Sequence, residues 1–412
     1  MKEFEKYPKN YKYLVAVSGG PDSMALLDML YKDNFTNLNV ALVNYKKRKV
    51  SDDEQLMVEE FCKKRNIPFY YSVYNDENLK GSFQVKAREY RYNFFVKLYF
   101  SLKCQGLFVA HQKDDLIETY LLKRKRNVIN ESYLILSENI IKKMMVLRPL
   151  LNFYKSELEE YCLKNNIPYS IDETNLLPIY TRNKIRISLK KQDKEKIYQE
   201  ALKAENNLQK TIIEVKEFIE KNKSIKICDL QNKNDLFLQF FLYYKIDSKY
   251  QKKVNKNLLN QLKNMLNSSK SSIEYLIVDN YYLIKAYDKI ILSYIDNVNF
   301  SYEVNDFKKF KTPYFEIVDS GKKMQGIYLT KEDFPIIIRN YKKEDKIKLK
   351  SGEKKVSRLF IDKKIPLFLR NTIPLIENKN HEIIFVYGLY RKYLLINSQN
   401  NYFMLQYTID VL

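Results

Sequence analysis

The chain contains no tryptophan, and its 412 residues include only two histidines, four cysteines and eight glycines. The four cysteines lie far apart and form no CxxC pair, which argues against a disulfide framework, a structural zinc site and an iron–sulfur cluster. We therefore expect reduced thiols in a reducing compartment. Because glycine is scarce, the one adjacent pair, Gly19 and Gly20, marks a place where the backbone adopts a positive φ or passes close to a ligand.

Long apolar runs are also missing. Hydrophobic residues make up 45% of the chain, yet no segment approaches the roughly 18 to 20 apolar residues that a membrane-spanning helix needs. The N-terminal stretch MKEFEKYPKNYKY lacks the apolar core of a signal peptide. These absences predict a soluble, cytoplasmic protein without a membrane partner.

Negative charge is in deficit, because 72 lysines and arginines face 50 acidic residues and give a net charge of +22. Such a balance favours a polyanionic partner, since each phosphate neutralised by Lys or Arg releases counterions. An AT-rich genome is the alternative explanation, because it raises the lysine content everywhere. Arginine is more informative: nine of the 13 arginines fall in the first 190 residues, where a rigid bidentate fork is needed.

Short apolar runs alternate with helical patterns over residues 1–190. The runs are YLVAV (13–17), NVALVNY (39–45), IPFYYSVY (67–74) and GLFVAH (106–111). Strands that alternate with helices predict an α/β fold, with a parallel sheet covered by helices on both faces. Ligands of such sheets bind at the carboxyl ends of the strands. We therefore expect a catalytic domain over residues 1–190 with its site at that edge.

The remainder of the chain divides into two further patterns. A long, charged helical stretch over 192–223 begins a mixed middle region, which we place at 191–325. Within it we expect two further helical segments, LFLQFFLYY and KNLLNQLKNML. From 326 to 412 short strands and turns predict a small β-rich domain, with a helix near VSRLFIDKK.

The hexapeptide SGGPDS follows the first predicted strand. Pro21 suits the first turn of a helix, and Ser18, Asp22 and Ser23 surround its exposed backbone N–H groups with polar side chains. Neither GxxxxGK[ST] nor GxGxxG occurs, so the usual loop for γ-phosphate transfer is absent. The turn predicts a phosphate site, and a tight strand-to-helix turn with no ligand is the alternative.

A second group of chemically active residues lies in AHQKDDLIET, residues 110–119. At helical spacing Asp114, Asp115 and Glu118 share one face, and crowded carboxylates favour a bound cation. Magnesium is normally held by one or two carboxylates together with substrate phosphates. Two simpler interpretations stay open: the acids complement a helix dipole, and His111 is a hydrogen-bonded structural group.

Two further motifs carry arginines at helical spacing. In KAREYRY, Arg88 and Arg91 are three residues apart and can reach one ligand, or they lie on a solvated helix face. In DETNLLPIYTRNKIR, Arg182 and Arg186 flank Asn183 after a turn-rich stretch. This segment could order over a substrate, and an ordinary loop with a helix cap is the alternative.

Several of these motifs together resemble a known family. SGGPDS resembles the pyrophosphate loop of the ATP pyrophosphatases, which have the PP-loop, adenine nucleotide alpha hydrolase-like fold. The order SGGPDS, KAREYRY, AHQKDDLIET, LRPLL, DETN and RNKIR resembles the tRNA(Ile)-lysidine synthetases over about residues 13–190. The segment that begins IIIRNYKKEDKIKLK is similar to the family's C-terminal tRNA-binding domain, whereas the middle region matches only in length and helical character.

The resemblance implies an enzyme with two steps. ATP adenylates the C2 oxygen of the wobble cytidine in tRNA(Ile) with a CAU anticodon, and pyrophosphate leaves. The ε-amine of free L-lysine then displaces AMP, which leaves lysidine and changes the codon that is read from AUG to AUA. The implied cofactors are ATP and Mg²⁺, and a homodimer is left open.

The resemblance also implies roles for individual residues. The turn over Ser18, Gly19, Gly20, Pro21, Asp22 and Ser23 would bind pyrophosphate, and Asp22 and Asp115 would hold magnesium. The implied catalytic residues are Asp22, Arg88, His111, Asp115 and Glu118. The implied contacts to tRNA or substrate are Arg91, Asp172, Asn175, Arg182, Asn183, Arg186, Arg358 and Arg370, with Arg339 and Arg391 also placed at the acceptor stem.

Two positions depart from the family pattern. The family usually has a histidine where this chain has Tyr45, and often a second one where it has Gln112. We interpret both positions as peripheral, because the carboxylates and the loop are intact.

Two other functions remain to be weighed. A tRNA thiolase on the same fold predicts cysteine pairs near the site, which the four separated cysteines do not supply. A non-enzymatic tRNA-binding protein predicts that the acidic residues can be lost without effect.

Overall fold

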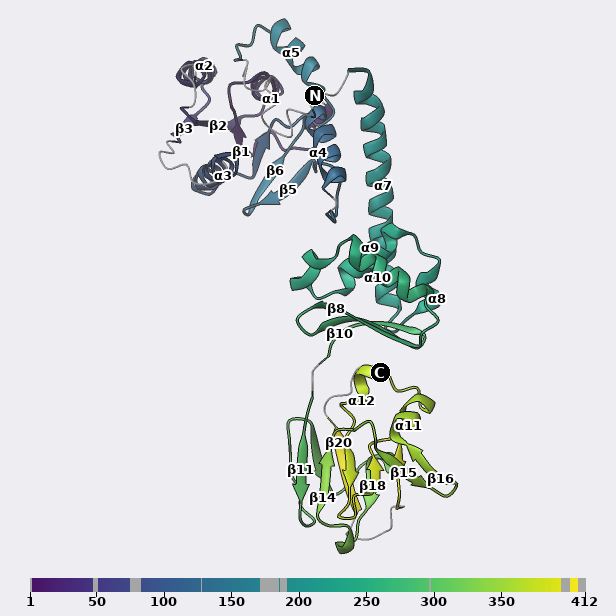
Figure 1. The fold of residues 1–412 in the computed structure, drawn as a ribbon. Helices are drawn as coiled ribbons and strands as arrows, with labels where there is room; N and C mark the ends of the chain where they lie inside the picture. The colour runs from purple at the N-terminus through teal and green to yellow at the C-terminus, as the bar shows by residue number, and fades with distance from the viewer. Residues whose placement is uncertain are drawn as a thin grey trace. The chain divides into compact units, whose positions relative to one another are not determined.

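The computed structural model describes residues 2–46, 51–74, 83–126, 128–170, 185, 191–295, 298–393 and 401–406. The chain divides into two compact units, Met1–Ile212 and Ile213–Leu412 (Figure 1). In the part of the chain that is described, no helix has both the length and the apolar character needed to cross a membrane.

The first unit is built on a six-stranded sheet with the order β3-β2-β1-β4-β6-β5. All neighbouring pairs are parallel except β5 and β6, which form an antiparallel hairpin. This confirms the predicted parallel sheet. The strands are β1 (Lys12–Ala16), β2 (Asn37–Asn44), β3 (Phe69–Val73), β4 (Gly106–Val109), β5 (Glu138–Ile141) and β6 (Met144–Leu147).

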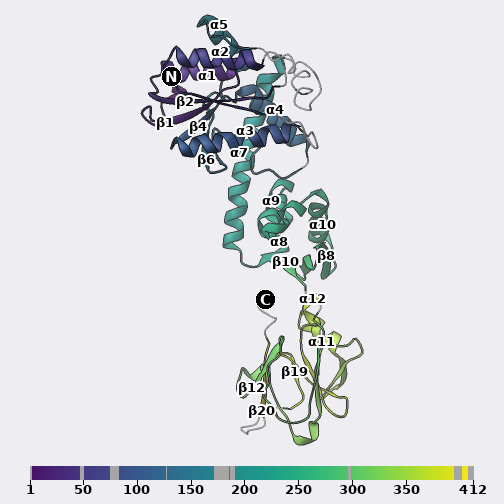
Figure 2. The same cartoon turned by 90° about the vertical axis from the view of Figure 1, so that its left-hand side faces the viewer.

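Helices cover both faces of this sheet, as Figure 2 shows for α1 and α2 on one side and α3 on the other. Side chains of a strand alternate between its two faces, so Val15 packs in one core with α1, α2 and α5, and Leu14 packs in a second core with α3. The helical elements are η1 (Lys2–Phe4), α1 (Pro21–Lys32), α2 (Ser51–Lys63), α3 (Phe83–Ser101), α4 (Lys113–Lys125) and α5 (Lys155–Lys164).

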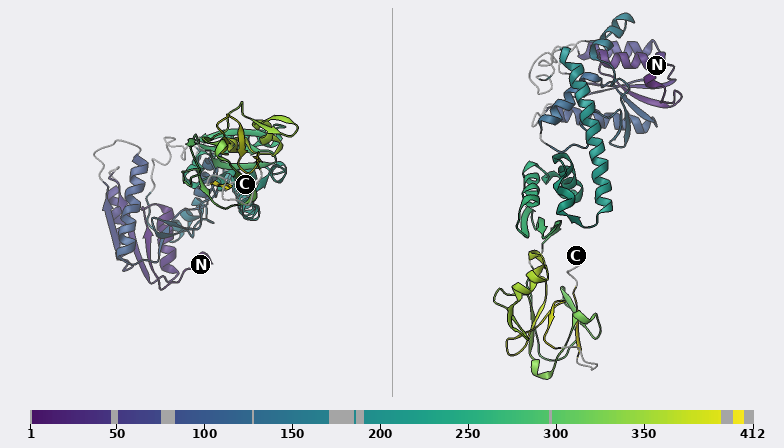
Figure 3. Two further views of the ribbon diagram at one scale, coloured as in Figure 1. Left: turned by 90° about the horizontal axis from the view of Figure 1, so that it is seen from below. Right: turned by 90° about the vertical axis from the view of Figure 1, so that its right-hand side faces the viewer.

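The long helix α7 (Lys191–Lys221) belongs to both units in sequence, and Figure 3 shows it as one continuous helix. It confirms the charged helix predicted over 192–223. Its first turns pack on α4 of the first unit, since Lys194 forms an ion pair with the buried carboxylate of Asp114. The compact unit therefore extends beyond the predicted limit at residue 190.

The second unit begins with helices packed near an antiparallel sheet of order β7-β10-β9-β8. The helices α9 and α10 coincide with the predicted helical segments LFLQFFLYY and KNLLNQLKNML. The elements are β7 (Ile225–Lys226), α8 (Ile227–Gln231), α9 (Asp235–Lys245), η3 (Ser248–Lys253), α10 (Lys256–Asn267), β8 (Ser272–Val278), β9 (Tyr281–Ala286) and β10 (Lys289–Tyr294).

The C-terminal part is rich in β-structure, as predicted. It contains sheets of order β11-β14-β17-β18-β19, β12-β20-β13 and β15-β16. The elements are β11 (Ser301–Val304), β12 (Phe315–Val318), η4 (Lys323–Gln325), β13 (Gly326–Tyr328), η5 (Lys331–Asp333), β14 (Ile336–Arg339), β15 (Lys346–Leu349), β16 (Gly352–Lys355), α11 (Val356–Asp362), α12 (Leu367–Arg370), β17 (Leu375–Glu377), β18 (Ile383–Val386), β19 (Tyr390–Arg391) and β20 (Asn401–Gln406). Because β11 pairs with β14, this sheet starts before the domain limit that we predicted at residue 326.

Candidate active site

The turn between β1 and α1 has the backbone expected of an anion site. Gly19 has a φ of +81°, a conformation that side chains with a Cβ rarely adopt. Gly20 is the N-cap of α1 and Pro21 stands at its first position, so no side chain of the cap bonds to the first turn. The turn therefore presents the positive end of the helix dipole at the carboxyl edge of the sheet.

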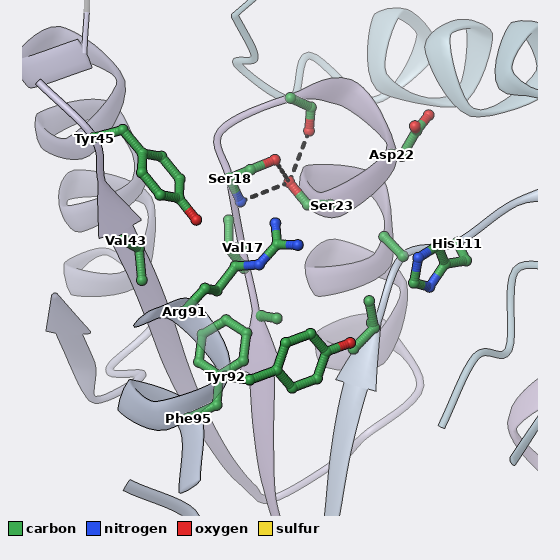
Figure 4. A pocket seen from close by; sticks show the side chains of 14 residues that line it. Val17, Ser18, Asp22, Ser23, Val43, Tyr45, Arg91, Tyr92, Phe95 and His111 are labelled. Atoms are coloured by element: carbon green, nitrogen blue, oxygen red, sulfur yellow. Dashed lines mark hydrogen bonds between the residues drawn. The ribbon is translucent and has the colours of Figure 1, made fainter. Parts of the chain in front are cut away.

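The hydroxyls of this turn hold one another in place (Figure 4). Ser23 Oγ donates to the Gly20 carbonyl oxygen at 3.0 Å and accepts from the Ser18 backbone N–H at 3.2 Å. The Ser18 Oγ lies 3.3 Å from Ser23 Oγ. The turn thus carries two serine hydroxyls that can rotate to donate hydrogen bonds to a phosphate.

A cavity of about 190 Å³ opens beside the turn. Ser18, Gly20, Asp22 and Ser23 line it, and His111 joins them from the chain that follows β4 (Figure 4). The opposite wall is largely apolar. It is formed by Ala16, Val17, Val43, Tyr45, Tyr92, Phe95, Val109 and Ala110. An anion-binding turn next to an apolar wall suits a ligand that joins phosphates to a flat, apolar ring.

The acidic residues of α4 divide into separate environments. Asp114 is buried and accepts hydrogen bonds from the Lys155 backbone N–H at 3.0 Å and from Lys194. Asp115 accepts from the Gln112 backbone N–H at 3.1 Å, as the third residue of a capping box. Glu118 is buried. Asp115 therefore caps α4 itself, as the helix-dipole interpretation expects, whereas the Asp114 side chain binds the first residue of α5 and Lys194 of α7.

The side chains that the structure describes do not assemble a metal site by themselves. Within the described ranges no three His, Cys, Asp or Glu residues are arranged to hold a metal ion. Asp22 lines the cavity, whereas Asp115 and Glu118 do not. One or two carboxylates suffice for magnesium when phosphates supply the other oxygens.

Of the two predicted arginines of α3, only Arg91 lines the cavity. Arg88 is exposed. Both guanidinium groups contact the ring of Tyr92, Arg88 at 4.9 Å and Arg91 at 6.0 Å from its centroid. Tyr92 is thus the residue that brings the two cations together.

Five predicted substrate residues lie outside the described residues. They are Asp172, Asn175, Arg182, Asn183 and Arg186.

The predicted tRNA contacts of the C-terminal part have different exposures. The Arg358 side chain is 67% exposed and its Nε lies 3.2 Å from Asp362. Arg370 is half-buried, and its Nε donates to the Ile365 carbonyl oxygen. Arg391 donates to the Lys323 carbonyl oxygen. The prediction for Arg339 is wrong, because this side chain is buried and paired with two carboxylates.

The two positions that depart from the family pattern have clear local roles. The interpretation of both positions as peripheral is wrong for Tyr45, which lines the cavity. Its hydroxyl lies 3.4 Å from the Ala87 carbonyl oxygen, and burial raises the pKa of its phenol. Gln112 is the N-cap of α4, and its Oε1 accepts from the Asp114 backbone N–H at 2.5 Å. Neither residue therefore supplies a group that titrates near neutral pH.

Sequence motifs alone predicted no role for several residues of the site. Tyr92 and Phe95 of α3 form much of the apolar wall, and their spacing resembles that of any core-facing helix residues. Arg148 follows β6 and its Nε lies 3.1 Å from His111 Nδ1. Arg148 directly follows a short apolar run, in LRPLL, and this position at the end of a strand could have indicated that it lies near the site.

Comparison with known proteins agrees with this geometry. The family model of the PP-loop domain matches residues 1–193, and that of the TilS substrate C-terminal domain matches residues 336–400. Three curated relatives are each called tRNA(Ile)-lysidine synthase. The protein of Mesoplasma florum is 32% identical over 86% of this chain and 91% of its own length. That of Mycoplasma mycoides subsp. mycoides is 32% identical over 91% and 96%, and that of Streptococcus mutans is 31% identical over 93% and 91%. A chain that aligns with these relatives over 86% to 93% of its length, and whose residues 1–193 match the PP-loop domain, belongs to the tRNA(Ile)-lysidine synthase family.

Proposed function

We propose that this protein ligates free L-lysine to C2 of the wobble cytidine of tRNA(Ile) with a CAU anticodon. In the first step the C2 oxygen of cytidine attacks the α-phosphorus of ATP, and pyrophosphate leaves. In the second step the ε-amine of lysine attacks C2, and AMP leaves with that oxygen. The observation that carries the proposal is the cavity in which His111 joins Asp22 and the two serines of the SGGPDS turn.

The turn suits the departing pyrophosphate. The Ser18 and Ser23 hydroxyls and the N-terminus of α1 offer hydrogen-bond donors and a positive dipole where negative charge develops. The Arg91 guanidinium lies across the cavity and can bind a phosphate oxygen. The apolar wall, with Val43 and Phe95, suits the adenine ring.

The donor set fits magnesium. Asp22 supplies a carboxylate inside the cavity, and Asp115 at the start of α4 is the second candidate. The ion would offset charge on the triphosphate oxygens during adenylation. Carboxylates that do not hold the ion could bind the lysine ammonium, and the attacking amine must first lose its proton.

Labelled lysine tests the function directly. The protein is incubated with unmodified tRNA(Ile) of CAU anticodon, Mg-ATP and radiolabelled lysine, and the RNA and nucleotides are then separated. We expect label in the RNA together with equimolar AMP and pyrophosphate. The tRNA of methionine, which has the same anticodon, is the control substrate. Absence of label, or formation of ADP in place of AMP, would refute the assignment.

The thiolase alternative finds little support in the cysteines. Cys62, Cys104 and Cys162 are buried, and burial raises the pKa of their thiols to about 12, 11 and 11. No cysteine lines the cavity. A non-enzymatic tRNA-binding protein remains the second alternative, and it predicts binding of tRNA without consumption of ATP.

Arg358 gives a prediction for the C-terminal part. The substitution Arg358→Gln should weaken tRNA binding, because an exposed cation is lost, and should reduce the slope of log K against log salt by about 1. ATP binding should not change. Filter binding over a salt series measures both effects.

A matched control is available on α5. Lys164 is 72% exposed and forms an i,i+4 pair with Glu160, as Arg358 does with Asp362. If Lys164→Gln lowers the salt slope as much as Arg358→Gln, the C-terminal part has no special role in tRNA binding.

A further inference from the structure

The Arg148 guanidinium lies against the ring of His111, and the sheet explains why. Strands β4 and β6 are parallel neighbours, with Phe108 paired to Leu147. The residues that follow the two strands therefore leave the sheet at the same edge. His111 continues from β4 into the cavity wall, and Arg148 follows β6 directly.

Arg148 is held rigidly in this position. Only 5% of the residue is exposed, and its Nη1 donates to the Leu136 carbonyl oxygen at 2.8 Å and to Asn139 Oδ1 at 2.7 Å. Its backbone N–H donates to the Ser137 carbonyl oxygen at 2.8 Å. The β5–β6 hairpin thus fixes the direction in which the guanidinium points.

Arg148 also interacts with the Tyr92 side chain, and its bond to His111 fixes which ring nitrogen carries the hydrogen. Arg148 Nε lies 3.1 Å from His111 Nδ1, and a guanidinium nitrogen can only donate. His111 Nδ1 must therefore accept with its lone pair, and the neutral ring carries its hydrogen on Nε2. An imidazolium would place an N–H against this donor and a second positive charge beside the first. Burial lowers the pKa of Arg148, but arginine remains charged at neutral pH.

We propose that Arg148 is a positioning residue that holds His111 as the Nε2–H tautomer, so that the ring donates a hydrogen bond to nucleotide bound in the cavity. The proposal rests on the proposed function for the identity of the ligand. An N–H directed at a phosphate oxygen attracts it, whereas the opposite tautomer would direct a lone pair at it. Among the described residues, the other charged side chains that line the cavity are those of Asp22 and Arg91.

The tautomer can be observed without activity. The chain has only two histidines, so a long-range ¹H–¹⁵N spectrum of the unliganded full-length protein contains two rings. The variant His381→Gln identifies the signals of His111. At pH 7 we expect an unprotonated, hydrogen-bonded Nδ1 and a protonated Nε2. A protonated Nδ1 in the wild-type protein would overturn the proposal, whatever the lysine assay gives.

Substitution of Arg148 should release this preference. In Arg148→Met we expect the His111 signals to move toward a mixture of the two tautomers. Because Arg148 is buried, Asn139→Ala serves as a milder second variant, since it removes one acceptor that anchors the guanidinium and leaves the side chain in place. We expect a partial shift in the same direction. Unchanged His111 signals in both variants would contradict the positioning role.

A double-mutant cycle links the tautomer to the reaction. Arg148→Met should lower the rate of pyrophosphate release about tenfold to a hundredfold, as loss of a group that orients a functional histidine does elsewhere. In the background of His111→Gln the same substitution should have little further effect. If the two losses multiply, Arg148 acts independently of His111. If no variant, including the wild type, releases pyrophosphate, the proposed function fails while the spectroscopic result still decides the tautomer.

Discussion

Asp22→Asn should reduce the rate of AMP formation by about a thousandfold, the upper range for loss of one electrostatic contact at a reacting phosphate. Asp22 is in the first turn of α1 and lines the cavity beside Ser18 and Ser23. The substitution keeps the shape of the side chain and removes its charge. A neutral amide is a much poorer ligand than a carboxylate for a hard cation.

The binding of ATP distinguishes a role of Asp22 as a magnesium ligand from a role that does not involve the ion. If Asp22 holds magnesium, Asp22→Asn should abolish the strengthening of ATP binding by Mg²⁺ and should leave metal-free binding equal or tighter. Isothermal titration with and without Mg²⁺ measures both. Metal-dependent binding at wild-type strength in the variant would exclude Asp22 as the ligand.

A control for Asp22 lies in the same domain. Asp53 is an exposed acid in the first turn of α2, and it does not line the cavity. Asp53→Asn makes the same chemical change at a comparable helix position. It should leave AMP formation within about twofold of the wild type, because surface substitutions away from a site change little.

Arg339→Met should destabilise the C-terminal part by about 3 to 5 kcal/mol, the range for a buried ion pair that loses one partner. The Arg339 guanidinium donates to both Asp345 carboxylate oxygens at 2.9 and 2.8 Å and to Glu377 at 2.7 Å. All three residues are buried. Without the cation, two carboxylates would remain in the interior beside β14 and β17.

Hydrogen exchange in the full-length protein measures this loss locally. Amides of β14 and β17 should exchange at least about a hundredfold faster in Arg339→Met, since each 1.4 kcal/mol corresponds to a tenfold change. Lys346→Met is the matched control, because Lys346 forms an exposed ion pair with Glu353 in the same part of the chain. That pair should contribute less than about 1 kcal/mol.

Acidification supplies a second test of the same cluster. Burial by itself would raise the pKa of Glu377, but hydrogen bonds from His381 and Arg339 outweigh burial and lower it. In the wild type this stabilisation is present above the unfolded pKa of about 4.3 and is lost as the pH falls through the lower folded value. In Arg339→Met protonation relieves buried charge, so the difference from wild type should shrink at low pH. A difference that is independent of pH would mean that lost packing, not charge, destabilises the variant.

The sequence was sufficient to predict those helices, strands and turns for which residue preference and apolar pattern indicate the same structure. Apolar runs bounded by polar turns predicted the central strands, and Gly19, Gly20 and Pro21 predicted the strand-to-helix turn, because only glycine adopts its positive φ at low cost. The segments LFLQFFLYY, KNLLNQLKNML and VSRLFIDKK were predicted to contain helices, and the structure has α9, α10 and α11 there. The hairpin β5–β6 was not predicted, because short strands over 138–147 carry little periodic signal.

The roles of charged residues were predicted less well. Asp114, Asp115 and Glu118 have the same charge and share one helix face. Tertiary packing makes their roles different, because Asp114 alone of the three bonds to α5 and α7 in the contacts described above. Arg339 and Arg358 are equally basic in sequence, but one is buried and the other exposed. Exposure depends on contacts between residues distant in the chain, which a local pattern does not contain.

The sequence by itself determined the class of fold, the phosphate turn and the order of the motifs, since each depends on backbone preferences of a few adjacent residues. Only the tertiary structure decided which side chains line the cavity and which other residues position those side chains. His111 and Arg148 are 3.1 Å apart because β4 and β6 are neighbours in the sheet, and strand order is a property of the whole domain.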